Sequence, residues 1–117
     1  MHSRAQFGQW GEEITCNYLI QKGYKIVSRN YRCRFGEIDI IAEKEGEITF
    51  VEVKSRKTLM FGTPAMAVTK SKQTKIHSTA FQYLQTCNRR YRQFSFDVVE
   101  VYVVEGNTTI NHIQHCF

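Results

Sequence analysis

Two apolar runs, at about residues 37–43 and 47–54, contain charged side chains where a buried strand normally has none. Asp39 lies among isoleucines in the first run, and Glu52 and Lys54 alternate with valines in the second. Burial of an isolated charge costs several kcal/mol unless a counter-charge or a metal ion compensates for it. The chain must therefore fold so that these charges are compensated, which makes them the first candidates for a functional site.

The totals favour one globular domain with an anionic partner. A chain of 117 residues, 42% of them apolar, predicts a single domain, residues 1–117, with its own core. Sixteen Lys and Arg outnumber eleven Asp and Glu, giving a formal net charge of +5. Six of the acids fall within residues 37–52, with basic clusters on either side. This pattern suits a metal site beside a polyanion, and ordinary solvated charges explain it equally well.

The cysteines and the hydropathy pattern favour a cytoplasmic protein. The four cysteines are widely separated and form no Cys-x-x-Cys pair, and the first residues do not resemble a signal peptide. We therefore expect reduced thiols. No apolar stretch approaches the length of a membrane span, so we expect no membrane partner.

Hydrophobic spacing and turn residues predict the order helix, three strands, helix, two strands. Ser3 and Gln6 fit a capping box for the first helix, Glu45-Gly46 fits a hairpin turn, and Thr69 fits the N-cap of the second helix. An irregular basic stretch is expected after the first strand, and a loop with Gly62 and Pro64 is expected before the second helix. The expected elements are a helix at 4–22 and strands at 24–27, 37–43 and 47–54, then the second helix and strands at 94–104 and 108–113.

Strand geometry predicts that the charged residues share a face. Side chains alternate across a strand, so Glu52 and Lys54 point to one side and Val51 and Val53 to the other. If the strands at 37–43 and 47–54 form a hairpin, Asp39 lies close to Glu52.

The first helix supplies a third acid to the same end of the sheet. Glu12 falls beside the apolar stripe of this helix, and Glu13 is the alternative. Carboxylates brought together by Glu12, Asp39 and Glu52 would repel one another and take up protons unless a hard divalent cation held them. Magnesium fits this composition better than zinc, because neither thiolates nor imidazoles are part of it.

Lys54 needs a separate role, because a protonated ammonium group cannot bind a metal. Beside a metal-bound water it can orient the nucleophile or stabilise charge on a phosphate, as in metal-assisted phosphodiester hydrolysis. The pattern Glu-x-Lys also occurs as an exposed cross-strand charge pair, and the residues alone leave both interpretations open.

Five motifs resemble the YraN family in order and spacing, and the resemblance extends over nearly the whole chain through Lys75-Ile76, Ala80, Tyr83-Leu84 and Phe96-Asp97-Val98-Val99. The five motifs are Gly8-Gln-Trp-Gly11-Glu12, Asn30-Tyr-Arg, Gly36-Glu-Ile-Asp39-Ile-Ile-Ala, Val51-Glu-Val-Lys54-Ser-Arg56 and Phe61-Gly-Thr-Pro64-Ala-Met-Ala-Val68.

That family in turn resembles the PD-(D/E)XK nucleases, such as archaeal Holliday junction resolvases and restriction enzymes. The resemblance implies an α/β fold, a restriction-endonuclease-like mixed five-stranded sheet flanked by helices. It implies that Glu12, Asp39 and Glu52 correspond to the acidic metal ligands of these nucleases and Lys54 to their catalytic lysine. It also implies that the backbone carbonyl of Val53 binds the metal. The proline of the superfamily name is absent before Asp39, where it would contribute no ligand.

The resulting prediction is an endonuclease-like protein, dependent on Mg²⁺ or Mn²⁺, that hydrolyses phosphodiester bonds in DNA, including branched or damaged DNA. Four basic side chains are expected to contact phosphates without sequence specificity: Arg56, Lys70, Lys72 and Lys75. Symmetric cutting of two strands would require a homodimer, which no residue by itself establishes. Two alternatives stay open, a non-catalytic nucleic-acid binding module with the nuclease fold and an acidic-patch protein–protein adaptor.

Overall fold

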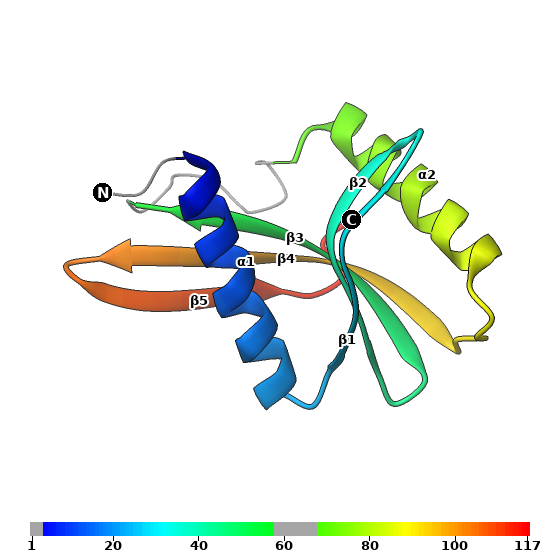
Figure 1. Cartoon of the computed structure of the whole chain (residues 1–117), viewed down its shortest axis with the longest axis horizontal. Helices are drawn as coiled ribbons and strands as arrows, with labels where there is room; N and C mark the ends of the chain where they lie inside the picture. The colour runs from blue at the N-terminus through cyan, green and yellow to red at the C-terminus, as the bar shows by residue number, and fades with distance from the viewer. Residues whose placement is uncertain (1–3, 58–67) are drawn as a thin grey trace.

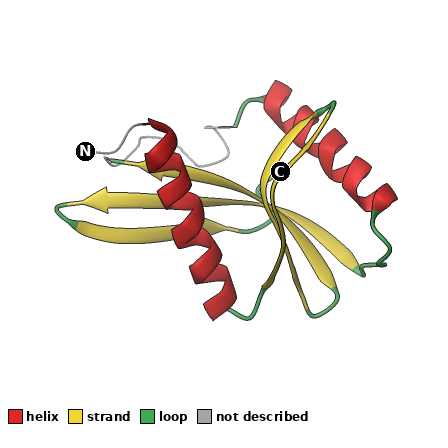
Figure 2. Cartoon of the chain, viewed as in Figure 1, coloured by secondary structure: helices red, strands yellow, loops and turns green. Residues whose placement is uncertain are grey.

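The computed structural model describes residues 4–57 and 68–117 of the chain, and these residues form two helices and one sheet (Figures 1 and 2). The order helix, three strands, helix, two strands is confirmed. The elements are α1 (Arg4–Gln21), β1 (Lys25–Cys33), β2 (Gly36–Lys44), β3 (Glu47–Arg56), α2 (Lys70–Thr86), β4 (Gln93–Val104) and β5 (Asn107–Ile113).

The sheet is mixed, with five strands in the order β1-β2-β3-β4-β5. Strands β3 and β4 are parallel, and every other neighbouring pair is antiparallel. A parallel pair needs a crossover connection, and the segment containing α2 provides it. The mixed five-stranded sheet flanked by helices, as predicted for a restriction-endonuclease-like fold, is therefore present.

Each helix packs on its own hydrophobic cluster. Leu19 of α1 packs with Val51 in one cluster, and Ile76 of α2 packs with Phe50 in the other. Figure 1 shows α1 crossing β3, β4 and β5, whereas α2 lies beside the β1–β2 hairpin. Because Val51 and Phe50 are successive residues of β3, the two clusters lie on opposite faces of that strand. Neither helix in the described part of the chain has the length and apolar character to cross a membrane.

The predicted turn and cap residues have the expected backbone. Gly23, after α1, has a φ of 95°, and Glu45 and Gly46 have φ values of 53° and 80° between β2 and β3. Two successive positive φ angles are typical of a type I′ hairpin turn. The Thr69 hydroxyl accepts a hydrogen bond from the Lys72 amide at 3.2 Å, which confirms the N-cap of α2.

Strand β1 is longer than predicted, because the stretch expected to be irregular continues the strand to Cys33. Its residues pair with β2 from Lys25 to Cys33, with a bulge between Ile26 and Ser28. As an edge strand, β1 leaves several polar side chains in water, so its apolar alternation is too weak to mark its length. Ser3, the loop with Gly62 and Pro64, and the motif from Phe61 to Ala67 lie outside the described residues.

Candidate active site

A glycine on α1 allows the helix to approach β3 closely. A Cβ at Gly11 would lie 1.9 Å from the Ser55 Oγ and 3.2 Å from the Ser55 Cβ, so the helix or the Ser55 side chain would have to shift for a larger residue. At Gly8, one turn earlier, a Cβ would meet nothing within 4 Å. The side chain of Ser55 points to the α1 face of β3, whereas those of Glu52 and Lys54 point to the α2 face, so Glu12 approaches the site from the other side of the sheet.

Asp39 lies where β2 and β3 separate. The pairing of these strands ends at Ile40 and Val51. Beyond that point the Asp39 Oδ2 accepts a hydrogen bond from the Val53 amide at 2.8 Å. The side chain of Asp39 thus bonds to the backbone of β3 where the regular ladder has stopped, and its carboxylate is held next to the segment that contains Glu52.

Glu52 is buried, with 4% of its surface exposed, and it forms an ion pair with α2. The Lys72 Nζ lies 3.1 Å from the Glu52 Oε2. Burial, and then the nearby Asp39 carboxylate, raise the pKa of Glu52 to about 7 against the opposing effects of Lys72 and Lys54. Glu52 therefore behaves as a carboxyl group that holds a proton near neutral pH.

Asp39 and Lys54 are perturbed by the same neighbours. Burial raises the pKa of Asp39, and the hydrogen bond from Val53 and the charge of Lys72 partly offset this. Burial also lowers the pKa of Lys54, and Lys72 lowers it further, whereas Glu52 opposes both effects. We call Asp39, Glu52, Lys54 and Lys72 the acid–lysine quartet. Its formal charges sum to zero when all four groups are ionised.

The structure also distinguishes between the two acids of α1. Glu13 is exposed and forms an ion pair with Arg29 at 2.8 Å. Glu12 is half-buried, and its pKa is raised by burial and then by the charge of Asp39. With its amide nitrogen turned towards the acid, Asn30 lies 3.2 Å from the Glu12 Oε1. Glu12, not Glu13, therefore lies within electrostatic range of Asp39, the one member of the quartet that affects its pKa.

The residues of the site fit a hard cation by chemistry, but they do not form a ready ligand group. Carboxylate oxygens and a backbone carbonyl are the donors that Mg²⁺ and Mn²⁺ prefer. Across residues 4–57 and 68–117, however, no three His, Cys, Asp or Glu side chains converge to hold a metal. The Lys72 ammonium supplies positive charge to Glu52 instead. Metal binding by Glu12, Asp39, Glu52 and the Val53 carbonyl therefore stays a prediction.

The basic residues expected to contact phosphates have different environments. Lys70 and Lys75 are exposed on the first turns of α2. Arg56 is half-buried at the end of β3, and its Nε has no hydrogen-bond partner among the described residues. Lys72 is paired with Glu52, a contact that the sequence analysis missed. The Thr69 cap indicates that Lys72 is on the first turn of α2, but no local pattern shows what that turn packs against.

A second buried carboxylate, Asp97, has a structural role. Its Oδ2 lies 2.6 Å from the His112 Nε2, and its Oδ1 accepts a hydrogen bond from the His115 amide at 3.2 Å. The other ring nitrogen of His112 lies 3.0 Å from the Tyr18 hydroxyl. These contacts connect β4, β5, the C-terminal segment and α1, so they stabilise the packing and account for Asp97 without a catalytic role.

Comparison with known proteins identifies relatives along nearly the whole chain. Residues 11–101 match the profile of the Uncharacterised protein family UPF0102. A UPF0102 protein of Syntrophomonas wolfei is 45% identical over 112 residues, which cover 96% of this chain and 97% of the relative. A UPF0102 protein of Clostridioides difficile is 47% identical over 110 residues, covering 94% and 95%. These matches confirm the predicted YraN-like family.

Among solved structures, one match is Pyrococcus furiosus SfsA in complex with Ca²⁺. The TM-score is 0.38 at 14% sequence identity, and the match covers 91% of this chain and 61% of that protein. This likeness is too distant to support a conclusion about the site.

Proposed function

Because the chain belongs to the uncharacterised protein family UPF0102, its function has to be inferred from the site, and we propose that it is a divalent-metal-dependent endonuclease-like protein that hydrolyses phosphodiester bonds in DNA. One observation carries this proposal. Two carboxylates from neighbouring strands, the half-buried Asp39 and the buried Glu52, lie within electrostatic range of each other and of two lysines. A relationship to the PD-(D/E)XK nucleases is part of the proposal.

The carboxylates would provide the metal site. Asp39, Glu52 and the Val53 carbonyl would hold Mg²⁺ or Mn²⁺, with Glu12 joining them from α1. A bound ion would lower the pKa of a water and neutralise charge on the phosphate. When all four groups of the quartet are ionised, a divalent cation without a substrate would leave it with two excess positive charges. Release of Glu52 by Lys72, together with one bound phosphodiester, would restore the balance.

Lys54 would act directly on the attacking water or the phosphate. Its lowered pKa leaves a larger fraction of Lys54 neutral, and so able to accept a proton, than of an ordinary lysine, and the Nζ lies within electrostatic range of both acids. The group can therefore orient the water through a hydrogen bond and stabilise negative charge on the phosphate. Lys70 and Lys75 are exposed beside the quartet on α2, where they would hold neighbouring phosphates.

Cleavage of a panel of DNA substrates tests this function. Duplex, single-stranded, flap and four-way junction DNA would be incubated with Mg²⁺ or Mn²⁺. We expect wild-type products to disappear in Asp39→Asn and in Lys54→Ala, and DNA affinity to be retained in Lys54→Ala. Lys25→Ala, which removes an exposed lysine of β1, is the control and should cleave as wild type does. Equal products from wild type and Lys54→Ala would point to a contaminating nuclease and contradict the proposal.

The ion pair between Lys72 and Glu52 favours a second candidate function. A non-catalytic DNA-binding module would also need a lysine to neutralise the buried acid. It would not need three converging metal ligands, and the described residues contain no such group. Calorimetric titration with Mn²⁺ separates the two. Binding that is lost in Glu52→Gln supports the metal-dependent enzyme, whereas no binding in wild type, with or without DNA, supports the binding module.

A further inference from the structure

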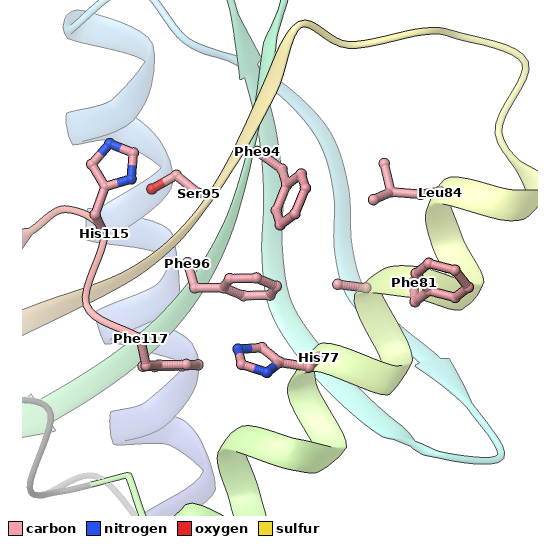
Figure 3. A pocket seen from close by; sticks show the side chains of 9 residues that line it. His77, Phe81, Leu84, Phe94, Ser95, Phe96, His115 and Phe117 are labelled. Atoms are coloured by element: carbon pink, nitrogen blue, oxygen red, sulfur yellow. The ribbon is translucent and has the colours of Figure 1, made fainter.

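An aromatic pocket lies away from the quartet, between α2, the start of β4 and the C-terminal segment (Figure 3). Its volume is about 510 Å³. Two imidazoles and four phenyl rings provide most of the lining: His77, His115, Phe81, Phe94, Phe96 and Phe117. No residue of the proposed metal site lines it, so the pocket needs its own explanation.

The walls of the pocket are ring faces and ring edges. The rings of His77 and Phe96 are 4.4 Å apart between centroids, and Phe96 and Phe117 are stacked at 5.7 Å with an angle of 20° between their planes. Figure 3 shows these rings and that of Phe94 around one hollow. Stacked and edge-on rings favour a flat aromatic ligand, because such a ligand makes offset-stacked and T-shaped contacts. An aliphatic chain gains none of these specific contacts.

Two of the rings remain largely in water. Phe81 is 63% exposed and Phe94 is 58% exposed, and they belong to α2 and β4 on either side of the pocket. Apolar surface of this size gains free energy when a ligand removes it from water. A planar ring that enters the pocket can cover both phenyl rings at once.

The charges near the pocket favour an anionic ligand. A second hollow shares His77 and Phe81 with the pocket and adds Arg34, whose guanidinium lies 4.7 Å from the ring centroid of Phe35. Among the described residues that line either hollow, none is acidic. A ligand that carries negative charge next to a flat ring meets a complementary surface here, and a nucleotide has this combination.

The position of the pocket on α2 connects it to the proposed active site. Lys72, which contacts Glu52, and Phe81, which lines the pocket, are nine residues apart on the same helix. At about 1.5 Å and about 100° per residue, they lie about 13.5 Å apart along the helix axis and point to opposite sides of the helix. A strand that contacts both residues therefore has to pass around α2, which takes more than the about four nucleotides that the axial distance alone would span.

From these observations we propose that the aromatic pocket binds an unpaired base of single-stranded DNA, while Arg34 contacts a neighbouring phosphate. Base stacking on Phe81 and Phe94 supplies affinity without sequence preference, as on other single-strand platforms. A duplex keeps its bases stacked on one another and cannot fill the pocket. The position of this pocket relative to a cut rests on the proposed endonuclease function, and base binding itself does not.

Fluorescence anisotropy in EDTA, where no cleavage occurs, tests the pocket with the whole chain. The probes are a labelled oligothymidylate of about 16 nucleotides, an abasic strand with the same number of phosphates, and a blunt duplex. We expect wild type to bind the base-bearing strand more tightly than the abasic strand. Phe81→Ala should weaken binding of the base-bearing strand by about fivefold to a hundredfold and leave the abasic strand unchanged. Equal affinity of wild type for the two strands would overturn the proposal.

Matched variants keep the test independent of folding and of the active site. Phe81 and Phe94 are mostly exposed, so replacing either by alanine removes little core packing. Ile20→Ala, a change at a 56% exposed residue of α1, is the control and should bind the base-bearing strand as wild type does. Phe94→Ala should repeat the loss seen in Phe81→Ala. If either variant instead turns a dimer into a monomer in sedimentation, the pocket is a contact between two copies and the proposal is wrong.

The two proposals can fail separately. Suppose that Glu52→Gln and wild type bind the metal equally well, but wild type binds the base-bearing strand more tightly than the abasic strand. The pocket proposal is then supported and the hydrolase proposal is contradicted. Suppose instead that metal-dependent cleavage is lost in Lys54→Ala, but wild type binds the base-bearing and abasic strands equally well. The hydrolase proposal is then supported and the pocket proposal is contradicted.

Discussion

Replacement of Glu52 by glutamine should stabilise the protein at alkaline pH and have a much smaller effect at acid pH. The pKa of Glu52 is raised from its ordinary value of 4.5 to about 7, chiefly by burial and by Asp39. At pH values between about 4.5 and about 7, Glu52 holds a proton in the folded chain and has released it in the unfolded chain. Stability is therefore lost as the pH rises from about 4.5 through about 7, and the loss is complete above that range. Glutamine is neutral throughout and avoids this loss.

The size of the effect follows from the difference between the two pKa values. One pKa unit corresponds to about 1.36 kcal/mol, so the difference between the two pKa values sets a limit of about 3 kcal/mol. Between pH 5 and pH 8 the linkage relation leaves about 2–3 kcal/mol of this. For a domain of 117 residues, with an unfolding entropy of about 2.1 cal/mol/K per residue, this amounts to about 10 °C in Tm. The attraction of Lys72 for the ionised acid lowers the pKa of Glu52 and is therefore already included in the value of about 7.

Urea unfolding at pH 5 and pH 8, in EDTA, measures this effect. The free energy of unfolding of Glu52→Gln minus that of wild type should be about 2–3 kcal/mol larger at pH 8 than at pH 5. Glu105→Gln, at the exposed turn between β4 and β5, is the control and should show no such change. An equal difference at the two pH values would refute the reasoning, because Glu52 would then not hold a proton in the folded state.

Two further predictions concern the contacts around the site. Gly11→Ala should destabilise the protein by about 1–3 kcal/mol in urea unfolding, because its Cβ meets Ser55. Gly8→Ala, whose Cβ meets no atom within 4 Å, should instead stabilise the protein by about 0.5–1 kcal/mol. Equal effects of the two substitutions would contradict the close packing of α1. Lys72→Met should bind Mn²⁺ about fivefold more tightly than wild type in calorimetry, because an ion pair worth about 1 kcal/mol no longer competes for Glu52. Unchanged or weaker binding would show that Lys72 does not oppose the metal.

Periodicity and turn chemistry predicted most of the elements, because both act over a few residues. The predicted hairpin between β2 and β3 is confirmed, because Glu45 and Gly46 both adopt the positive φ angles that the turn requires. The end of β1 was wrong, because an edge strand is stabilised by pairing with β2 while its side chains remain polar. Only the alternation along β3 was needed to place Glu52 and Lys54 on one face.

The sequence by itself determined which charged residues share a strand face, where α1 ends and α2 begins, and which family the chain resembles, because these depend on local geometry and on motif order. The tertiary structure alone decided what compensates the buried acids. Lys72 reaches Glu52 from a helix some twenty residues further along the chain, Asp39 bonds to the Val53 amide where two strands separate, and Glu12 takes the place that Glu13 could have had. The aromatic pocket likewise arises only when α2, β4 and the C-terminal segment meet. Burial and charge balance depend on such packing between distant segments, and no short stretch of sequence contains that information.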